Sequence, residues 1–315
     1  MKANNEKTKI IFFGSTEFSV PIFIRLIENF NVLALATEPD KQQGRNRKLA
    51  PPPTKIIAEQ HNVFCFQPKK IDETFIEKIK SLKPDLIVVA AYGKILPPEI
   101  LDLPANKCIN VHPSILPKYR GASPIQTALM ENEKETGITI IIMDEGMDSG
   151  DILAQKKVEI DATDNFISLS KRLAEISAEY LAEIIPQYLN NEIELKKQDN
   201  ESATFCRKIK KEDGKIDWNK SALEINNQIR AFAKWPGSYT FFSGKKLELM
   251  ICRLAEFETK KEIAIGQAFE KDKNVFVKCG SGNLEILELK LEGKNQCNIK
   301  NFINGYRNFI GAILN

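Results

Sequence analysis

The 315-residue sequence lacks several features that would assign it to a specialised class of protein. No stretch supplies the roughly 20 consecutive apolar residues that a membrane-spanning helix requires. The polar residues 1–9 have no apolar segment behind their charges, so no secretory signal is expected. The apolar fraction of 43% and the charged fraction of 28% are those of an ordinary globular protein. We therefore expect a cytoplasmic protein.

Cysteine and histidine are too few and too scattered for a metal centre or a disulfide framework. The six cysteines show no Cys-x-x-Cys spacing and have no histidine nearby. Of the two histidines, His61 follows a predicted helical stretch without an evident partner. We expect reduced, mostly structural cysteines and no metal.

A glycine-rich phosphate loop is also missing. Gly14 ends the first apolar run, where a nucleotide-binding fold would carry its phosphate loop. Neither Gly-x-Gly-x-x-Gly nor the Walker pattern is present there, so no phosphate-bearing cofactor is expected at this turn.

Apolar runs that alternate with helical patterns organise the N-terminal part of the chain. Strands are predicted at 9–13, 32–37, 63–66, 85–91, 107–112, 136–143 and 152–160, and helices at 18–29, 71–82, 125–132 and 165–189. Strands alternating with helices indicate an α/β fold with a Rossmann-like, mostly parallel sheet and helices on both faces. We assign residues 1–189 to a catalytic domain and the polar residues 190–204 to a linker.

Residues 205–315 differ in pattern and in charge. After a predicted helix come short alternating runs separated by glycine and lysine turns, which indicate a small OB-like β-barrel domain. This part contains 20 Lys and Arg residues against 13 Asp and Glu residues, a net charge of +7, whereas residues 1–204 carry −4. On charge alone, an anionic partner and a solvated lysine-rich surface explain this equally well.

Three polar residues stand out as candidates for catalysis. Asn110 and His112 are two apart on a predicted strand, so their side chains share a face. Asp148 follows in a glycine-flanked turn. An amide donor beside an imidazole can stabilise an oxyanion and manage a proton, and a carboxylate can hold the imidazole charged. Spacing alone favours a plainer interpretation, in which the histidine is a hydrogen-bonded polar residue at a strand end.

The combination of motifs is more specific than any one of them. Asn-x-His is followed by Ser-Ile-Leu-Pro-x-Tyr-Arg-Gly-Ala-Ser-Pro-Ile at 114–125, and by Met-Asp-x-Gly-x-Asp-x-Gly-Asp-Ile at 143–152. Together they resemble the active site of the formyltransferases that use 10-formyltetrahydrofolate. The resemblance implies catalytic roles for Asn110, His112 and Asp148, with 10-formyltetrahydrofolate as the formyl donor and no metal.

The same resemblance implies where the folate would bind. It points to the loop Ser114, Ile115, Leu116 and Pro117, and small or apolar residues at 90–96, including Ala91, Tyr92 and Gly93, can admit a flat pterin. For Ala91 to Gly93, plain packing at a strand end is an equally good explanation. Tyr119 and Arg120 are expected to support the loop.

A cation-rich segment bears on the second substrate. Residues 38–54 form a long polar loop, and four cations within eight positions, Lys41, Arg45, Arg47 and Lys48, can meet several phosphates. A disordered surface loop is the alternative. This loop and the motifs at 203–218 and 230–239 resemble those of the methionyl-tRNA formyltransferase family. The resemblance then covers nearly the whole chain. The resemblance implies that the acceptor arm of initiator methionyl-tRNA is the partner, in a monomeric enzyme of the bacterial cytoplasm.

Two alternatives belong to other functional classes. A sugar-nucleotide formyltransferase would share the Asn, His and Asp set but would not need a domain of charge +7. A non-catalytic RNA-binding protein would not need to keep all three residues. One assay separates the three possibilities, because each predicts a different acceptor for a labelled formyl group.

We predict that Arg45→Ala weakens productive use of tRNA and leaves folate binding intact, because a phosphate contact adds to tRNA affinity alone. The measurement is the dependence of the formylation rate on tRNA concentration, and an unchanged dependence would contradict the assignment.

Overall fold

The structure is a computed structural model that describes residues 8–43, 48–255, 257–258 and 262–315. The chain divides into two compact units. Unit 1 comprises residues 1–124, 135–159 and 170–206, and unit 2 comprises residues 125–134, 160–169 and 207–315.

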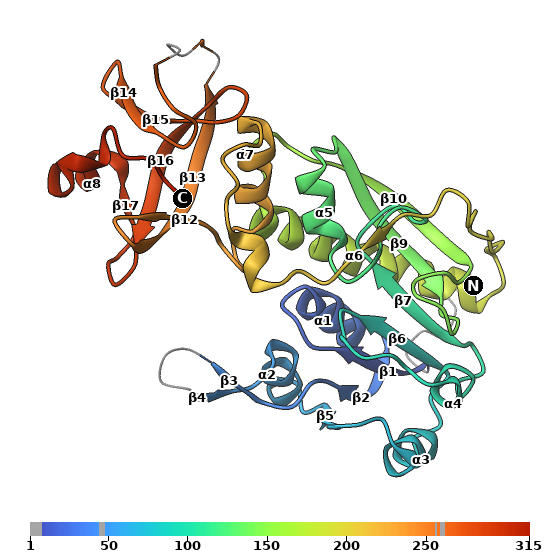
Figure 1. Ribbon diagram of the computed structural model, residues 1–315. Helices are drawn as coiled ribbons and strands as arrows, with labels where there is room; N and C mark the ends of the chain where they lie inside the picture. The colour runs from blue at the N-terminus through green and yellow to red at the C-terminus, as the bar shows by residue number, and fades with distance from the viewer. Residues whose placement is uncertain (1–7, 44–47, 256, 259–261) are drawn as a thin grey trace. The chain divides into compact units, whose positions relative to one another are not determined.

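A seven-stranded sheet forms the centre of unit 1 (Figure 1). Its strands are β1 (Lys9–Gly14), β2 (Asn31–Ala36), β5 (Phe64–Phe66), β6 (Leu86–Ala90), β7 (Cys108–His112), β9 (Glu135–Ile142) and β10 (Ile152–Glu159). They lie in the order β10-β9-β7-β6-β1-β2-β5. Strands β5, β2, β1, β6 and β7 pair in parallel, and β9 and β10 are antiparallel. This confirms the predicted mostly parallel sheet.

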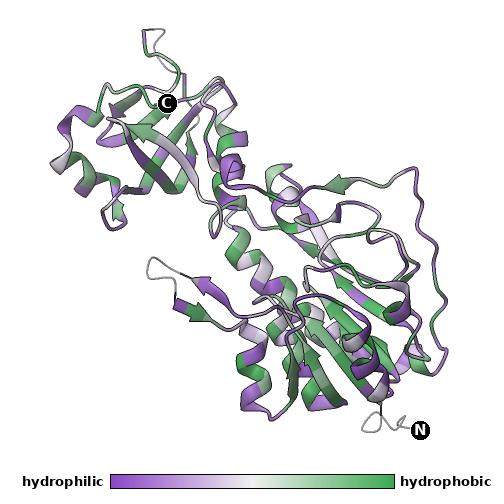
Figure 2. Ribbon diagram, turned by 60° about the horizontal axis from the view of Figure 1, so that its bottom comes forward, coloured by the Kyte–Doolittle hydropathy of each residue, from purple (hydrophilic) through white to green (hydrophobic). Residues whose placement is uncertain are grey.

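Helices cover both faces of this sheet. They are α1 (Ser19–Asn29), α2 (Pro53–Gln60), α3 (Glu73–Ser81), α4 (Pro98–Leu101) and most of α6 (Phe166–Leu189), whereas α5 (Pro124–Met130) lies in unit 2 except for its first residue. Phe12 stacks on Phe23 of α1, and its neighbour Phe13 meets Phe75 of α3. Adjacent residues of a strand point to opposite faces, so α1 and α3 lie on opposite sides. Burial on both sides explains why β1 is a continuous apolar run. Figure 2 shows the strands of this sheet largely in green, the colour of hydrophobic residues.

The cation-rich segment differs from the long loop that we expected. It contains an antiparallel hairpin of β3 (Lys41–Gln43) and β4 (Lys48–Ala50), and α2 follows it. Backbone pairing such as Lys41 with Ala50 creates the hairpin. The sequence gives no sign of it, because neither short strand has an alternating apolar pattern.

Residues 190–204, which we expected to form a linker, lie within unit 1. Lys196 exchanges backbone hydrogen bonds with Ile152 at the start of β10. The segment then leads into β11 (Phe205–Cys206), which pairs in parallel with β8 (Arg120–Gly121). The structural division therefore changes units after Cys206, and these residues run beside the loop that follows β7.

Unit 2 contains the expected antiparallel β domain. Its strands are β12 (Ser238–Phe242), β13 (Lys245–Ala255), β14 (Ala268–Lys271), β15 (Asn274–Lys278), β16 (Asn283–Leu291) and β17 (Cys297–Asn298), and the helices of this β domain are α7 (Ala222–Ala231) and α8 (Ile299–Gly305). Single turns of 3₁₀ helix occur at Lys211–Gly214 and Arg307–Phe309. The sheet and helices enclose an apolar core that includes Trp218, Ile225 and Phe309. Sequence patterns missed β14, β17 and α8.

One further property concerns the helices as a group. In the part of the chain that the structure describes, none is both long enough and apolar enough to pass through a lipid bilayer.

Candidate active site

The end of β7 brings two of the candidate residues to the edge of the sheet. Strand β7 pairs in parallel with β6 and antiparallel with β9, so it lies where the strand direction changes. Asn110 and His112 share one face of β7, as their spacing predicts. Ligands of open α/β sheets bind beyond the carboxyl ends of the parallel strands, and these two residues lie there.

A turn between β9 and β10 supplies the third residue. Asp148 has a positive φ of 50°, a conformation that costs energy for a residue with a side chain. The flanking Gly150 passes so close to β9 that an added Cβ would lie 1.8 Å from the Ile142 carbonyl oxygen. Only glycine fits that approach, which gives a physical reason for the glycine after Asp148.

The Asp148 carboxylate joins the three candidates. Asn110 Nδ2 donates to Asp148 Oδ1 at 3.2 Å, and His112 Nδ1 lies 3.5 Å from Asp148 Oδ2. The backbone N–H of Gly121 also donates to Oδ2, at 2.9 Å. The structure therefore brings together the amide, the imidazole and the acid that the sequence singled out from two separate segments.

The imidazole of His112 is held on both sides. Its side chain is only 4% exposed, and Nε2 lies 2.9 Å from the carbonyl oxygen of Tyr119. Because a carbonyl can only accept, Nε2 is the donor of this hydrogen bond. Asn110 differs, since its amide carries two hydrogens and Asp148 takes one of them. The bond to Asp148 uses one hydrogen, so the second is the one left to donate to a substrate oxygen.

The loop expected to bind folate is partly buried. Ser114 and Leu116 are buried, whereas Ile115 and Pro117 are half-buried. Ser114 Oγ donates to the Lys118 carbonyl at 2.6 Å. The structure thus leaves Ile115 and Pro117 as the accessible members of this expected set.

Thr139 of β9 holds that loop. Its hydroxyl donates to the carbonyl of Ser114 at 2.7 Å and accepts the backbone N–H of Leu116 at 3.0 Å. Gln155 Nε2 also donates to the Thr139 hydroxyl, at 3.0 Å. One buried hydroxyl therefore fixes two backbone groups of the loop.

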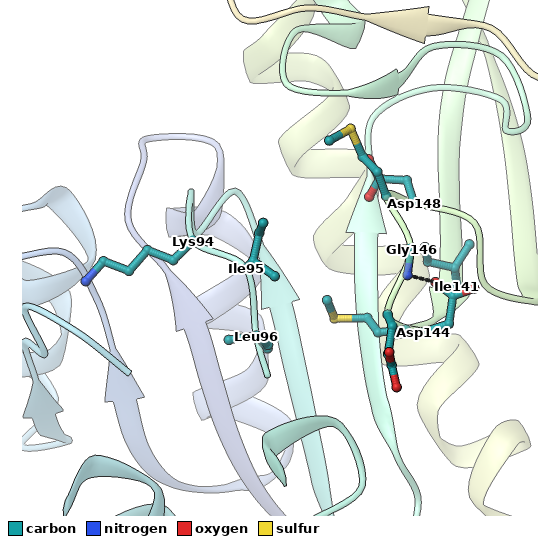
Figure 3. A pocket seen from close by; sticks show the side chains of 10 residues that line it. Lys94, Ile95, Leu96, Ile141, Asp144, Gly146 and Asp148 are labelled. Atoms are coloured by element: carbon teal, nitrogen blue, oxygen red, sulfur yellow. Dashed lines mark hydrogen bonds between the residues drawn. The ribbon is translucent and has the colours of Figure 1, made fainter. Parts of the chain in front are cut away.

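A cavity of about 150 Å³ lies beside Asp148 (Figure 3). It is lined by Lys94, Ile95, Leu96, Ile141, Met143, Asp144, Glu145, Gly146, Met147 and Asp148. Ile95 and Met147 are 86% and 60% exposed, so apolar surface reaches solvent here. The cavity is a candidate site for the flat, partly apolar part of a substrate.

The expected segment Ala91 to Gly93 lies just before the cavity lining. Ala91 and Gly93 are exposed, and Tyr92 is buried with its ring against Phe13. Burial raises the pKa of the Tyr92 phenol to about 12, so it stays neutral. Tyr92 thus packs in the core, while Lys94, Ile95 and Leu96 line the cavity.

Two of the four expected tRNA-contacting cations, Lys41 and Lys48, lie on the hairpin. Lys41 forms an ion pair with Glu38 at 2.6 Å, and Lys48 is exposed on β4. Arg45 and Arg47 lie outside the described residues.

Two residues near Asp148 have contacts that the sequence did not reveal. Arg120 is buried, and its guanidinium donates to the side chain of Gln198. Gln198 belongs to residues 190–204, the segment expected to be a linker. Gln198 in turn donates to the backbone around Asp148. Arg120 was expected only to support its loop. Gln198 carried no signal, because it lies in a polar stretch without periodicity.

Among the residues that the structure describes, no three His, Cys, Asp or Glu side chains are grouped so as to hold a metal ion.

Comparison with known proteins identifies the class to which this fold and site belong. The family described as formyl transferase matches residues 8–185, and the C-terminal domain of formyl transferases matches residues 208–307. Both parts of the chain thus have the sequence pattern of formyltransferases.

Individual relatives narrow the class. The methionyl-tRNA formyltransferase of Caldanaerobacter subterraneus subsp. tengcongensis is 42% identical over 97% of this chain and 99% of its own length. That of Geobacter sulfurreducens is 40% identical over 95% and 94%. The chain belongs to the methionyl-tRNA formyltransferase family.

Solved structures support the fold. A methionyl-tRNA formyltransferase from Clostridium thermocellum has a TM-score of 0.54 at 20% identity, covering 89% of this chain and 99% of that one. WlaRD, a sugar 3N-formyl transferase, has a TM-score of 0.66 at 20% identity over 91% and 99%. At this identity the likeness shows the fold alone.

We predict that Thr139→Val destabilises the protein. Valine has nearly the same shape but leaves the Leu116 N–H and the Ser114 carbonyl without their partner, at a cost of about 1–3 kcal/mol. The measurement is the free energy of unfolding in urea. Thr139→Ser keeps the hydroxyl and is the control, and equal stability of the valine and serine variants would contradict the role of the hydroxyl.

Proposed function

We propose that this protein transfers the formyl group of 10-formyltetrahydrofolate to the α-amine of methionyl-initiator tRNA, giving N-formylmethionyl-tRNA for translation initiation. Family membership over nearly the whole chain supports the choice of substrates. The single observation that carries the chemistry is the Asp148 carboxylate, which contacts Asn110 and His112 and also lines the cavity.

The proposed reaction makes one C–N bond and breaks another. The neutral α-amine attacks the formyl carbon on N10 of the folate, and a tetrahedral intermediate with an oxyanion forms. The bond from carbon to N10 then breaks, while a proton leaves the amine and is delivered to N10. The protein contributes position, charge and proton transfer, since the folate supplies an activated formyl group.

Asn110 is proposed to donate its free amide hydrogen to the oxyanion. His112, held by Asp148 at Nδ1, is proposed to stabilise the same oxygen and to help move the proton, through water where direct contact is lacking. Direct contact from Nε2 requires the ring to exchange its hydrogen bond with the Tyr119 carbonyl. Asn110 needs no such exchange, so it is the first donor to the oxygen.

The folate is proposed to bind across the cavity and the loop after β7. Ile115 and Pro117 offer partly exposed apolar surface, and Ile95 and Met147 offer more at the cavity. Flat heterocycles are bound by such surfaces, with backbone groups at their polar edge. Ser114, Leu116 and residues 91–93 would then act mainly by shaping the backbone.

The tRNA is proposed to bind through its acceptor arm. Lys41, Arg45, Arg47 and Lys48 would contact its phosphates, and the basic C-terminal domain would contribute further cations. We assign residues 1–189 to formyl transfer and residues 205–315 to tRNA binding. The protein is proposed to act as a monomer in a bacterial cytoplasm.

A single assay tests the acceptor. Labelled 10-formyltetrahydrofolate is supplied with methionyl-tRNA or with a 4-amino sugar nucleotide, and the labelled product is identified. We expect label on methionyl-tRNA. Label on the sugar, or on neither acceptor, would refute the proposed function.

We predict that Asn110→Ala and Asp148→Ala lower the turnover number about 10²- to 10³-fold, the usual effect of losing one oxyanion donor or its support. Thermal unfolding should show that both variants fold. The measurement is single-turnover formylation of methionyl-tRNA, with Asp102→Asn as a control because that carboxylate is exposed and pairs with Lys107. Rates near that control would remove both residues from the mechanism.

A further inference from the structure

The side-chain amide of Gln198 uses all of its hydrogen-bonding groups. Its oxygen accepts from Arg120 Nε at 3.0 Å and from Arg120 Nη2 at 2.8 Å. Its nitrogen donates to the carbonyl of Asp148 at 2.8 Å and to that of Gly150 at 2.7 Å. One amide thus links the loop after β7 to the turn that carries Asp148.

Arg120 makes this link rigid. It is only 5% exposed, and its Nη2 also donates to Asn200 Oδ1 at 2.9 Å. Its backbone N–H donates to the carbonyl of Thr204 at 2.9 Å. A buried guanidinium needs acceptors for its donors, and Gln198 and Asn200 accept hydrogen bonds from its Nε and Nη2.

Both ends of this link lead to the Asp148 carboxylate. Gly121, which follows Arg120, donates its backbone N–H to Asp148 Oδ2. At the other end, Gln198 holds the carbonyl of Asp148 itself, in a residue whose φ is positive. A strained conformation persists only where neighbouring contacts enforce it. The two N–H groups of Gln198 are such contacts.

We propose that Gln198 is a positioning residue for the transfer reaction: it keeps the Asp148 carboxylate in contact with Asn110 and His112. The inference rests on the proposed function and extends it to a residue that contacts the side chain of none of the three candidate catalytic residues. A shift of the carboxylate by about 1 Å is enough to lower a rate by about 10²-fold.

The chemistry of an amide is specific to this position. Only a group that donates on one side and accepts on the other satisfies both the two carbonyls and Arg120. Glutamate has the same size and still accepts from Arg120, but it has no N–H for the carbonyls of Asp148 and Gly150. Leucine has a similar size and offers neither.

We predict that Gln198→Leu and Gln198→Glu each lower the turnover number about 10- to 100-fold, with little change in KM for either substrate, because the carboxylate is misplaced while the binding surfaces remain. The assay is formylation of methionyl-tRNA by the full chain. Asp199→Asn is the control, since its side chain is exposed and contacts only its own turn. Wild-type turnover in Gln198→Glu would overturn the proposal.

A double-mutant cycle separates positioning from general stability. If Gln198 acts through Asp148, Gln198→Leu should cost little further activity in an Asp148→Ala background. An equal fold-loss in both backgrounds would show that Gln198 acts elsewhere, and the proposal would fail.

A readout independent of activity keeps this inference distinct from the proposed function. Crystal structures of the wild type and of Gln198→Leu give the separation of His112 Nδ1 and Asp148 Oδ2, which is 3.5 Å here. We expect it to increase in the variant. An unchanged separation would refute the positioning role, whether or not the wild type formylates an acceptor. A wild type that formylates no acceptor tested would refute only the proposed function.

Discussion

The Asp148 carboxylate is the group on which the rest of the site depends. It takes hydrogen bonds from Asn110 and from the backbone of Gly121, and it faces the imidazole of His112. Its side chain is only 17% exposed, so these contacts replace much of the hydration that the charge has lost. A poorly hydrated charge is stable only when polar groups surround it. The same contacts fix the two side chains relative to each other, which catalysis requires.

The fold meets this requirement by combining a rigid edge with an enforced turn. Asn110 and His112 belong to β7, a strand paired on both sides, so their backbone has little freedom. Asp148 lies in a turn, and its position depends on the close approach of Gly150 to β9 and on the two hydrogen bonds from Gln198. The sheet therefore fixes the positions of Asn110 and His112, and long-range contacts fix the position of Asp148.

The contrast between strands buried in the sheet and a turn held by long-range contacts explains which features could be predicted from the sequence. Strands such as β1 and β6 are buried on both faces and appear in the sequence as apolar runs. The turn around Asp148 was predictable because glycines flank Asp148 in the sequence. Gln198 was not predictable, because its importance arises from Arg120 and from a turn 50 residues earlier. The hairpin of β3 and β4 was missed for a related reason, since its backbone pairing leaves no pattern in side chains that face water.

The hydrogen bonds also suit the two polar residues of β7 to different roles in the proposed mechanism. Both ring nitrogens of His112 face protein groups, whereas Asn110 keeps one amide hydrogen beyond its bond to Asp148. In the proposed mechanism, Asn110 can donate this hydrogen to a substrate oxygen without giving up its bond to Asp148. His112 can meet it only by exchanging the Tyr119 carbonyl, which lies next to Arg120 and so is held by residues 198–204. The imidazole is therefore better suited to support and proton transfer than to first contact with the oxyanion.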